Sequence, residues 1–396
     1  MADSPPLAII DWGINSYSGW GVNGLNLALS WLRDGSFLPV CASPMKAEHL
    51  DLSPLEWQRM AAVLRDSADL CRQFEAYADQ DITVSVPLLR GLGNGLNSGR
   101  AAGNTLVTGK PTVGVCYLEH TALDAAALER AKPLAHIVAG SGFVQRVLEG
   151  AGIGPVTTVL QGIDPTHFHP GPRAGWFRDR FVIFSGGKPE FRKGQDLVLL
   201  AFRAFLQRHP EALLLTAWHS PWPQFARSLE TNPAVAPPRF KEDGRFDPAG
   251  WAADNGIPAD SIVDLGHVPN AAMARILREA DVGLFPNRCE GGTNLVAMEC
   301  MACGVPAILS ANTGHLDLLG GEGHCLPLRR QGPVSHPAGA EGWGESDLEE
   351  MVEALEHVWR DRAAAAAIGA AGADLLAGLT WDRYAAGIAA ILRQSP

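Results

Sequence analysis

Residues 282–310 constrain the fold more than any other part of this chain. A short apolar run at 282–285 stops at Pro286, a Gly-Gly pair and cap-type residues follow, and the apolar stretch 295–303 has the length of a helix. A glycine and a proline end that helix, and residues 305–309 resume as a buried strand. This order predicts a parallel sheet in which free backbone N–H groups at a helix N-terminus lie beside the carboxyl end of a strand. Anions and nucleotides bind at such places.

Two glutamates, Glu290 and Glu299, flank the glycine pair and the start of the helix. Glu299 is the one acidic residue between Glu290 and Asp317, and no Lys or Arg falls in that interval. A carboxylate inside an apolar helix is unfavourable unless something bonds it. The spacing leaves two interpretations open. Glu299 lies on the solvent side or pairs with a distant arginine, or it bonds a ligand.

Size and composition indicate a globular protein with two domains. The 396 residues are 46% hydrophobic and 19% charged, which is enough for a large core. The net charge of -11 and the lack of a basic run argue against nucleic acid as the main partner. No apolar run reaches the ~18 residues of a membrane span. The longest candidate, 363–379, is interrupted by Asp374.

Cysteine usage and the N-terminal sequence predict a cytoplasmic location. Seven cysteines are scattered without a disulfide framework, which is typical of a reducing compartment. Cys300 and Cys303 have zinc-like spacing, but no second Cys or His pair follows at ligand spacing, so we expect small core residues and no metal site. The N-terminus lacks a basic segment and leads directly into a strand, so a signal peptide is not expected.

Alternating strands and helices predict two α/β halves joined by a linker at 164–180, which contains three prolines. In the first half we expect strands at 7–10, 37–42, 82–87, 112–118, 135–139 and 156–160, and helices at 22–33, 122–131 and 143–150. In the second half we expect strands at 181–185, 213–217, 262–265, 282–285 and 305–309, and helices at 196–208, 295–303, 348–359 and 384–392. The Pro-rich residues 222–256 read as a surface excursion. The expected fold class is α/β, with two doubly wound parallel sheets and a cleft between the halves.

The first half contains a G-x-G-x-x-G pattern at residues 19–24. In a dinucleotide-binding fold this pattern follows the first strand directly, and an acidic residue ends the second strand. Here residues 11–18 intervene and the second strand ends without an acid, so binding of a nicotinamide dinucleotide is disfavoured. Two interpretations remain. The glycines let backbone N–H groups approach a phosphate, or they allow a strand and a helix to pack closely.

The second half opens with a strand that runs into two glycines and a basic cluster of Lys188, Arg192 and Lys193. The spacing is not that of a Walker A loop, but it can set two ammonium groups against a diphosphate. A solvated basic turn is the alternative.

In the first half, Glu119 and His120 follow an expected strand at the sheet edge where ligands bind, with a structural histidine as the alternative.

Several motifs, in their order along the chain, resemble those of the retaining glycosyltransferases of family 4, which have the GT-B fold of two Rossmann-like domains facing a central cleft. In the second half they are GGK at 186–188 with KG at 193–194, LGHV at 265–268, and the two glutamates followed by MACGVP at 301–306. In the first half they are the glycine loop at 19–21, GSGFV at 140–144 and QGIDP at 161–165. The resemblance covers nearly the whole chain and is strongest at 181–320.

The resemblance implies a site for a UDP- or GDP-linked sugar. Lys188 and Lys193 would hold the diphosphate, and Glu299 would bond the nucleotide ribose. Glu290 would lie beside the donor sugar, and so would His120. The residues implied in catalysis are Glu290, Lys193, Lys188 and His120.

Backbone contacts complete the implied donor site. Gly19 and Gly21 would approach the diphosphate from the first half, and His267 and Val268 fall where the base is held. The implied donor-binding residues of the glycine loops and the helix start are Gly187, Gly292, Thr293, Asn294 and Leu295.

The chain departs from the family pattern at two positions. Lys188 stands where the family usually has arginine, and lysine is a point charge rather than a bidentate fork. Eight residues separate Glu290 from Glu299, one more than the family's usual spacing. Counting back from Glu299 places the first-glutamate position at Gly291. Either the loop bulges by one residue, which glycines permit, or Glu290 has a different role.

The resemblance also implies the domain order and the reaction. Residues 1–170 would form the acceptor domain and 171–380 the donor domain, and the helix at 381–396 would cross back to the first domain. The reaction would move a sugar from a nucleotide-diphosphate sugar to a carbohydrate or glycoconjugate acceptor with retention of anomeric configuration, without a metal or another cofactor.

The alternatives are a GT-B-like nucleotide-sugar epimerase and a non-catalytic nucleotide-sugar-binding protein, which use the same nucleotide site. The sequence does not identify the acceptor, the base or the oligomeric state. Peripheral membrane contact occurs in the family, although no basic amphipathic helix is visible here.

Overall fold

The structure is a computed structural model that describes residues 4–321 and 323–395. The chain divides into two compact units, which we call the N-terminal unit and the C-terminal unit. The N-terminal unit comprises Met1–Gly162, Pro269–Ala271 and Leu379–Pro396, and the C-terminal unit comprises Ile163–Val268 and Ala272–Gly378. The chain passes to the C-terminal unit after Gly162, just before the predicted linker at 164–180, and returns at Leu379, and the short segment Pro269–Ala271 also belongs to the N-terminal unit.

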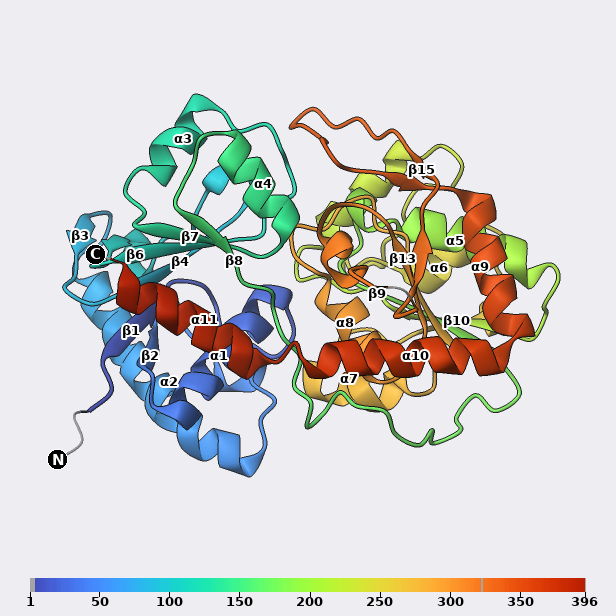
Figure 1. The fold of residues 1–396 in the computed structure, drawn as a ribbon, viewed down its shortest axis with the longest axis horizontal. Helices are drawn as coiled ribbons and strands as arrows, with labels where there is room; N and C mark the ends of the chain where they lie inside the picture. The colour runs from blue at the N-terminus through green and yellow to red at the C-terminus, as the bar shows by residue number, and fades with distance from the viewer. Residues whose placement is uncertain (1–3, 322, 396) are drawn as a thin grey trace. The chain divides into compact units, whose positions relative to one another are not determined.

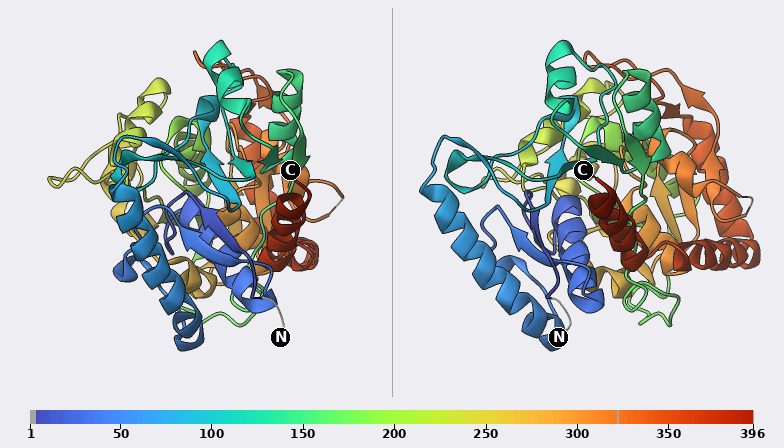
Figure 2. Two further views of the ribbon diagram at one scale, coloured as in Figure 1. Left: turned by 90° about the vertical axis from the view of Figure 1, so that its left-hand side faces the viewer. Right: turned by 60° about the vertical axis from the view of Figure 1, so that its left-hand side comes forward.

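The N-terminal unit is built on a six-stranded parallel sheet with strand order β2-β1-β4-β6-β7-β8 (Figure 1). Its strands are β1 (Leu7–Ile10), β2 (Leu38–Cys41), β4 (Leu88–Leu92), β6 (Thr112–Cys116), β7 (His136–Ala139) and β8 (Val156–Thr158). Its helices are α1 (Gly19–Asp34), α2 (Pro54–Glu75), α3 (Ala125–Ala131), α4 (Gly142–Gly150) and α11 (Trp381–Gln394). Two short strands, β3 (Asp81–Thr83) and β5 (Leu106–Thr108), pair separately. Figure 2 shows the long helix α2 running beside this sheet.

The last helix, α11, packs against α1 within the N-terminal unit. The fully buried indole of Trp31 donates a hydrogen bond to the Ala385 carbonyl at 3.2 Å. The Ser30 hydroxyl donates to the Asp382 carboxylate at 2.7 Å.

The predicted helix over 143–150 begins almost as expected, because the Ser141 hydroxyl accepts from a first-turn backbone N–H of α4.

The C-terminal unit contains a second six-stranded parallel sheet, in the order β11-β10-β9-β12-β13-β14. Its strands are β9 (Phe181–Gly186), β10 (Ala212–Ala217), β11 (Ile262–Asp264), β12 (Val282–Phe285), β13 (Ala307–Ser310) and β14 (Leu326–Leu328), and a hairpin pairs β15 (Gln331–Gly332) with β16 (Glu345–Ser346). The helices that follow are α5 (Gln195–Leu206), α6 (Pro248–Asp254), α7 (Asn270–Leu277), α8 (Leu295–Ala302), α9 (Leu348–Arg360) and α10 (Arg362–Ala377). Two doubly wound parallel sheets confirm the predicted fold class.

Two predictions of local structure are wrong, and some helices were not predicted. The strand expected at 82–87 is displaced, since the sheet strand is β4, and helix α2 was missed. Residues 222–256 are not a surface excursion, because they contain α6 and bury Trp251 completely in the core. The apolar residues 363–379, for which no element was predicted, lie largely in α10, which packs against α8. Across the described residues, no helix has both the length and the apolarity that a membrane span requires.

Candidate active site

The candidate site lies at the carboxyl ends of β9, β12 and β13, three adjacent strands of the C-terminal sheet. From β9 the chain continues to β10 and β11 on one side of the sheet, whereas β12 to β14 extend it on the other side. The gap between β9 and β12 is therefore the point where the strand order reverses, and ligands of open α/β sheets bind at such points. The loop after β9 and the loop after β12 carry half of the predicted donor-binding residues, namely Gly187, Lys188, Lys193, Gly292, Thr293 and Asn294.

Glycines bring these two loops together. Gly194 has φ 72°, and a Cβ atom there would lie 2.4 Å from the Pro286 carbonyl oxygen. The backbone N–H groups of Arg288 and Cys289 both donate to the Arg192 carbonyl, at 2.7 and 3.2 Å. Only glycine allows this approach of the β9 loop to the β12 loop, so Gly194 fixes where the neighbouring basic side chains lie.

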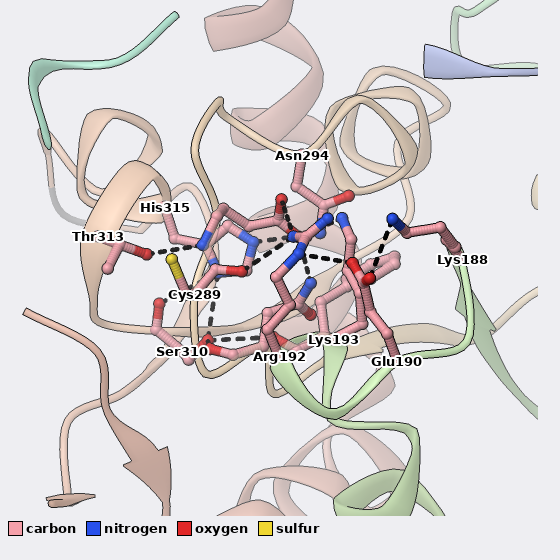
Figure 3. Close-up of polar contacts among 12 residues, drawn as sticks. Lys188, Glu190, Arg192, Lys193, Cys289, Asn294, Ser310, Thr313 and His315 are labelled. Carbon is pink, nitrogen blue, oxygen red and sulfur yellow. Dashed lines mark hydrogen bonds and ion pairs between the residues drawn. The ribbon is translucent and has the colours of Figure 1, made fainter. Parts of the chain in front are cut away.

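Five charged side chains from the two loops form one cluster (Figure 3). Glu190 pairs with Lys188 at 2.9 Å and with Arg192 at 2.5 Å. Glu290 pairs with Lys193 at 2.5 Å and with Arg192 at 3.4 Å. Three cations thus share two carboxylates, which leaves the cluster with an excess positive charge. Such a cluster at a sheet edge attracts a diphosphate.

In the cluster's central pair, the side chain of Glu290 is 6% exposed and that of Lys193 is 13% exposed. Burial and the neighbouring Arg192 lower the pKa of Lys193, and Glu290 opposes that shift. Burial alone would raise the pKa of Glu290, but Lys193 and Arg192 outweigh it and hold that pKa below its usual value. The Asn287 amide also donates to Glu290 Oε1. Glu290 is therefore an ionised carboxylate that binds cations of its own chain.

A second buried ion pair, between Arg288 and Asp196, lies next to the cluster. Arg288 is fully buried, and its guanidinium binds both oxygens of Asp196, at 2.9 and 2.6 Å. It also donates to Glu345 at 2.7 Å and to the Phe191 carbonyl at 2.7 Å. Sequence reasoning missed this pair. The available signal was an arginine three residues after the end of a fully apolar strand, where a buried charge requires a partner.

Helix α8 begins beside the cluster. Asn294 precedes the helix with φ 64°, so the left-handed residue of this loop is an asparagine. The unbonded backbone N–H groups of the first helical turn and the helix dipole favour an anion at this end. Glu299 lies on α8 and is only 5% exposed, which removes the solvent-side interpretation.

The remaining predicted residues of the C-terminal unit lie along the same sheet edge. His267 follows β11, and its ring stacks on that of His219 at 4.0 Å between centroids. Burial first, and then the neighbouring His267 and Arg245, lower the pKa of His219 to about 4. Gly187 follows β9 directly with φ 123°, and Thr293 is buried. Val268, Gly292 and Leu295 are half-buried.

Three predicted residues, Gly19, Gly21 and His120, belong to the N-terminal unit. Helix α1 begins at Gly19, three residues earlier than expected, so the glycines form its first turn rather than a loop. A Cβ atom on Gly21 would lie 2.3 Å from Asn15, which supports the close-packing interpretation at that position, whereas one on Gly19 meets nothing within 4 Å. His120 lies beyond β6, and its backbone N–H donates to the Asn94 side chain at 3.0 Å.

Comparisons with known proteins bear on the family and on the fold. Residues 269–388 match the family described as "Family 4 Glycosyltransferase in conflict systems". The D-inositol 3-phosphate glycosyltransferase of Thermobifida fusca (strain YX) is 29% identical over 259 residues, which make up 62% of this chain and 51% of that protein. The chain therefore spans about half the length of the curated relative that it matches.

Solved structures share the fold over nearly the whole chain. A sucrose-phosphate synthase from Thermosynechococcus elongatus superposes with a TM-score of 0.64 and 16% identity, covering 98% of both chains. Anabaena Alr3699/HepE in complex with UDP and glucose gives 0.63 at 12% identity, covering 98% of this chain and 100% of that one. An E. coli trehalose-6-phosphate structure bound with UDP-2-fluoro glucose gives 0.61 at 14% identity, covering 98% and 99%.

The two doubly wound sheets and these structural neighbours define a GT-B fold. The family match over residues 269–388 and the curated relative support the resemblance to the family 4 glycosyltransferases that the sequence motifs carry.

Proposed function

We propose that this protein transfers a sugar from a nucleotide-diphosphate sugar to an acceptor and retains the anomeric configuration. The observation that carries the proposal is the cluster of Lys188, Arg192 and Lys193 at the strand-order reversal of the C-terminal sheet, next to the start of α8. Cleavage of the donor builds negative charge on the leaving diphosphate. Preorganised cations and helix N–H groups stabilise that charge most when they are already held in place.

The cations of the cluster are held before any ligand binds. Lys193 lies against Glu290, and Lys188 lies between Glu190 and the ring of Phe225, with its ammonium 4.7 Å from the ring centroid. A diphosphate would join these cations without a large loss of side-chain freedom. Because they can neutralise the leaving group, we propose that the reaction needs no metal and no other cofactor. Glu299 is proposed to bond the ribose, and His267 and Val268 to lie by the base.

The relatives suggest where to begin the search for an acceptor. The curated relative is named for an inositol phosphate, and two of the structural neighbours are named for sugar phosphates. We therefore propose a phosphorylated sugar or polyol as the first acceptor class to test, and the N-terminal unit as its binding domain.

The proposal is tested by a thermal-shift screen of UDP, GDP and their sugar conjugates, followed by a transfer assay with the best donor. A true donor raises Tm by mass action. NMR of the product then reports its anomeric configuration, and the same assay with EDTA tests the independence from metal. Conversion of the donor to another nucleotide sugar without an acceptor would indicate an epimerase. Binding with neither transfer nor donor hydrolysis would indicate a binding protein.

A further inference from the structure

Two buried side chains that the proposed mechanism does not use, Asn294 and His315, contact each other beside the charged cluster (Figure 3). The Asn294 side chain does not cap helix α8. Its Nδ2 atom lies 3.1 Å from Nε2 of His315, which is fully buried after strand β13. An asparagine in a left-handed conformation is less favourable than glycine there. The contact with His315 holds this side chain in place.

The neighbours of His315 determine where its proton lies. Its Nδ1 atom is 3.2 Å from both the carbonyl oxygen and the hydroxyl oxygen of Ser310. That carbonyl can only accept, and the Ser310 hydroxyl already donates its proton to the Asn287 carbonyl at 2.5 Å. Nδ1 therefore carries the proton. Burial lowers the pKa of His315 to about 4, so the ring is neutral near pH 7 and Nε2 is an acceptor.

An accepting Nε2 sets the orientation of the Asn294 amide. The NH₂ group must face His315, and the carbonyl oxygen Oδ1 must point the other way. The reverse orientation would place two acceptors against each other in a buried site, which is unfavourable. Asn294 thus presents a fixed hydrogen-bond acceptor at the start of α8. It is one of the residues predicted to bind the donor.

Glu290, in contrast, is occupied by its own chain. Its Oε1 accepts from Lys193 and Asn287, and its Oε2 accepts from Arg192. The residue at the spacing where the family has its sugar-side glutamate is Gly291, which has no side chain to offer. We propose that Asn294 Oδ1, rather than Glu290, accepts a hydrogen bond from a hydroxyl group of the donor sugar, and that His315 is the positioning residue that fixes the amide. This inference rests on the proposed function.

The first test is Asn294→Gly, which removes the amide but suits the left-handed backbone. Its matched control is Asn104→Gly, the same exchange at an exposed left-handed residue (φ 57°) of the N-terminal unit. Affinities for UDP and UDP-glucose are measured by thermal shift and calorimetry, and GDP and GDP-mannose serve if the wild type prefers guanosine. We expect N294G to bind UDP as the wild type does, and to bind the sugar conjugate about five- to tenfold more weakly, the size of one hydrogen bond. N104G should leave both affinities unchanged.

The second test separates positioning from packing at residue 315. His315→Leu removes the acceptor and should reproduce the sugar-specific loss of N294G. His315→Gln keeps a side-chain acceptor that can face the amide, so it should recover most of the affinity. The double variant N294G/H315L should lose no more than N294G alone, because the two residues act through one contact.

The outcomes distinguish the inference from the function on which it rests. If N294G weakens UDP and UDP-glucose equally, or weakens neither, Asn294 does not contact the sugar and the inference is wrong while the proposed function stands. If H315L and H315Q lose the same affinity for the sugar conjugate, His315 has only a packing role and its positioning role is wrong. If the wild type binds no nucleotide and no nucleotide sugar, the proposed function fails, and this inference fails with it.

Discussion

Each unit has glycines after the first strand of its sheet, and the two glycine segments differ in what they approach. In the N-terminal unit, residues 19–24 form the first turns of α1, and Asp11 is the one charged residue between positions 11 and 24. Cβ atoms on Gly21 and Gly24 would meet the chain's own Asn15 and Trp12. These two glycines serve close packing of the unit on itself.

In the C-terminal unit, residues 187–194 contain two lysines and an arginine among their glycines. Gly194 lets this loop approach the loop after β12, and that contact gathers the charged cluster. A glycine pattern therefore indicates only that backbones come close. The charged residues within the same loop indicate whether an anion is the partner.

The comparison of the two glycine segments is tested most strongly at Lys193, where the largest loss of activity is expected. Replacing it with alanine removes a preorganised cation, and we expect kcat for sugar transfer to fall by ~10²–10³. The matched control is Lys132→Ala, which removes an exposed lysine paired with Glu129 in the N-terminal unit. Steady-state kinetics measure both variants. Equal turnover in K193A and K132A would remove the charged cluster from the mechanism.

Gly194 tests whether the loop contact itself matters. In Gly194→Ala the new Cβ would lie 2.4 Å from the Pro286 carbonyl, in addition to left-handed strain, and we expect unfolding free energy to fall by about 2–4 kcal/mol. Gly244→Ala places the same strain (φ 80°) in open space, so it should lose only about 1–2 kcal/mol. Urea denaturation compares them. A loss in G194A no larger than in G244A would contradict the close approach of the two loops.

Glu290 tests the electrostatics of the cluster through pH. Because the folded pKa of Glu290 is lowered from the usual 4.5, its stabilising contribution is present above that value and is lost as the pH falls through the lowered pKa. Glu290→Gln should therefore destabilise the protein by about 1–3 kcal/mol near pH 7. The difference from wild type should shrink below pH 4.5. Glu353→Gln, at an exposed pair with Arg330, is the control. A difference that does not change with pH would mean that Glu290 is not held by cations.

Local sequence patterns predicted most of the C-terminal sheet, because its strands are short apolar runs bounded by glycine or proline. Strand β12 and helix α8 lie almost where the pattern of residues 282–303 placed them. The errors arose where local and tertiary signals conflict. The core strand β4 contains a buried arginine and a glycine, and Trp251 is anchored in the core from a Pro-rich segment.

The candidate site was predictable only in its loops. The sequence shows lysines after one Gly-Gly turn and glutamates on either side of a second Gly-Gly turn. The structure brings Lys193 and Glu290 together as one ion pair. The supporting contacts were not predictable, because they join residues far apart in the chain. Arg288 binds Asp196, and His315 reaches Asn294, and no spacing rule links either pair.

The smallest effects are expected in the N-terminal unit, at Gly19 and Gly21, which lie two positions apart in helix α1. Gly21→Ala would press a Cβ atom against Asn15, so we expect it to lower unfolding free energy by about 1 kcal/mol. Gly19→Ala meets nothing within 4 Å and should be neutral or stabilise the helix by up to about 1 kcal/mol. Chemical denaturation measures both. If Gly19 also approaches the donor's diphosphate, as the family resemblance implies, G19A should weaken UDP binding without any loss of stability. Unchanged UDP affinity in G19A would limit the role of this glycine pattern to packing, and would leave the loop of the C-terminal unit as the glycine segment that serves the nucleotide.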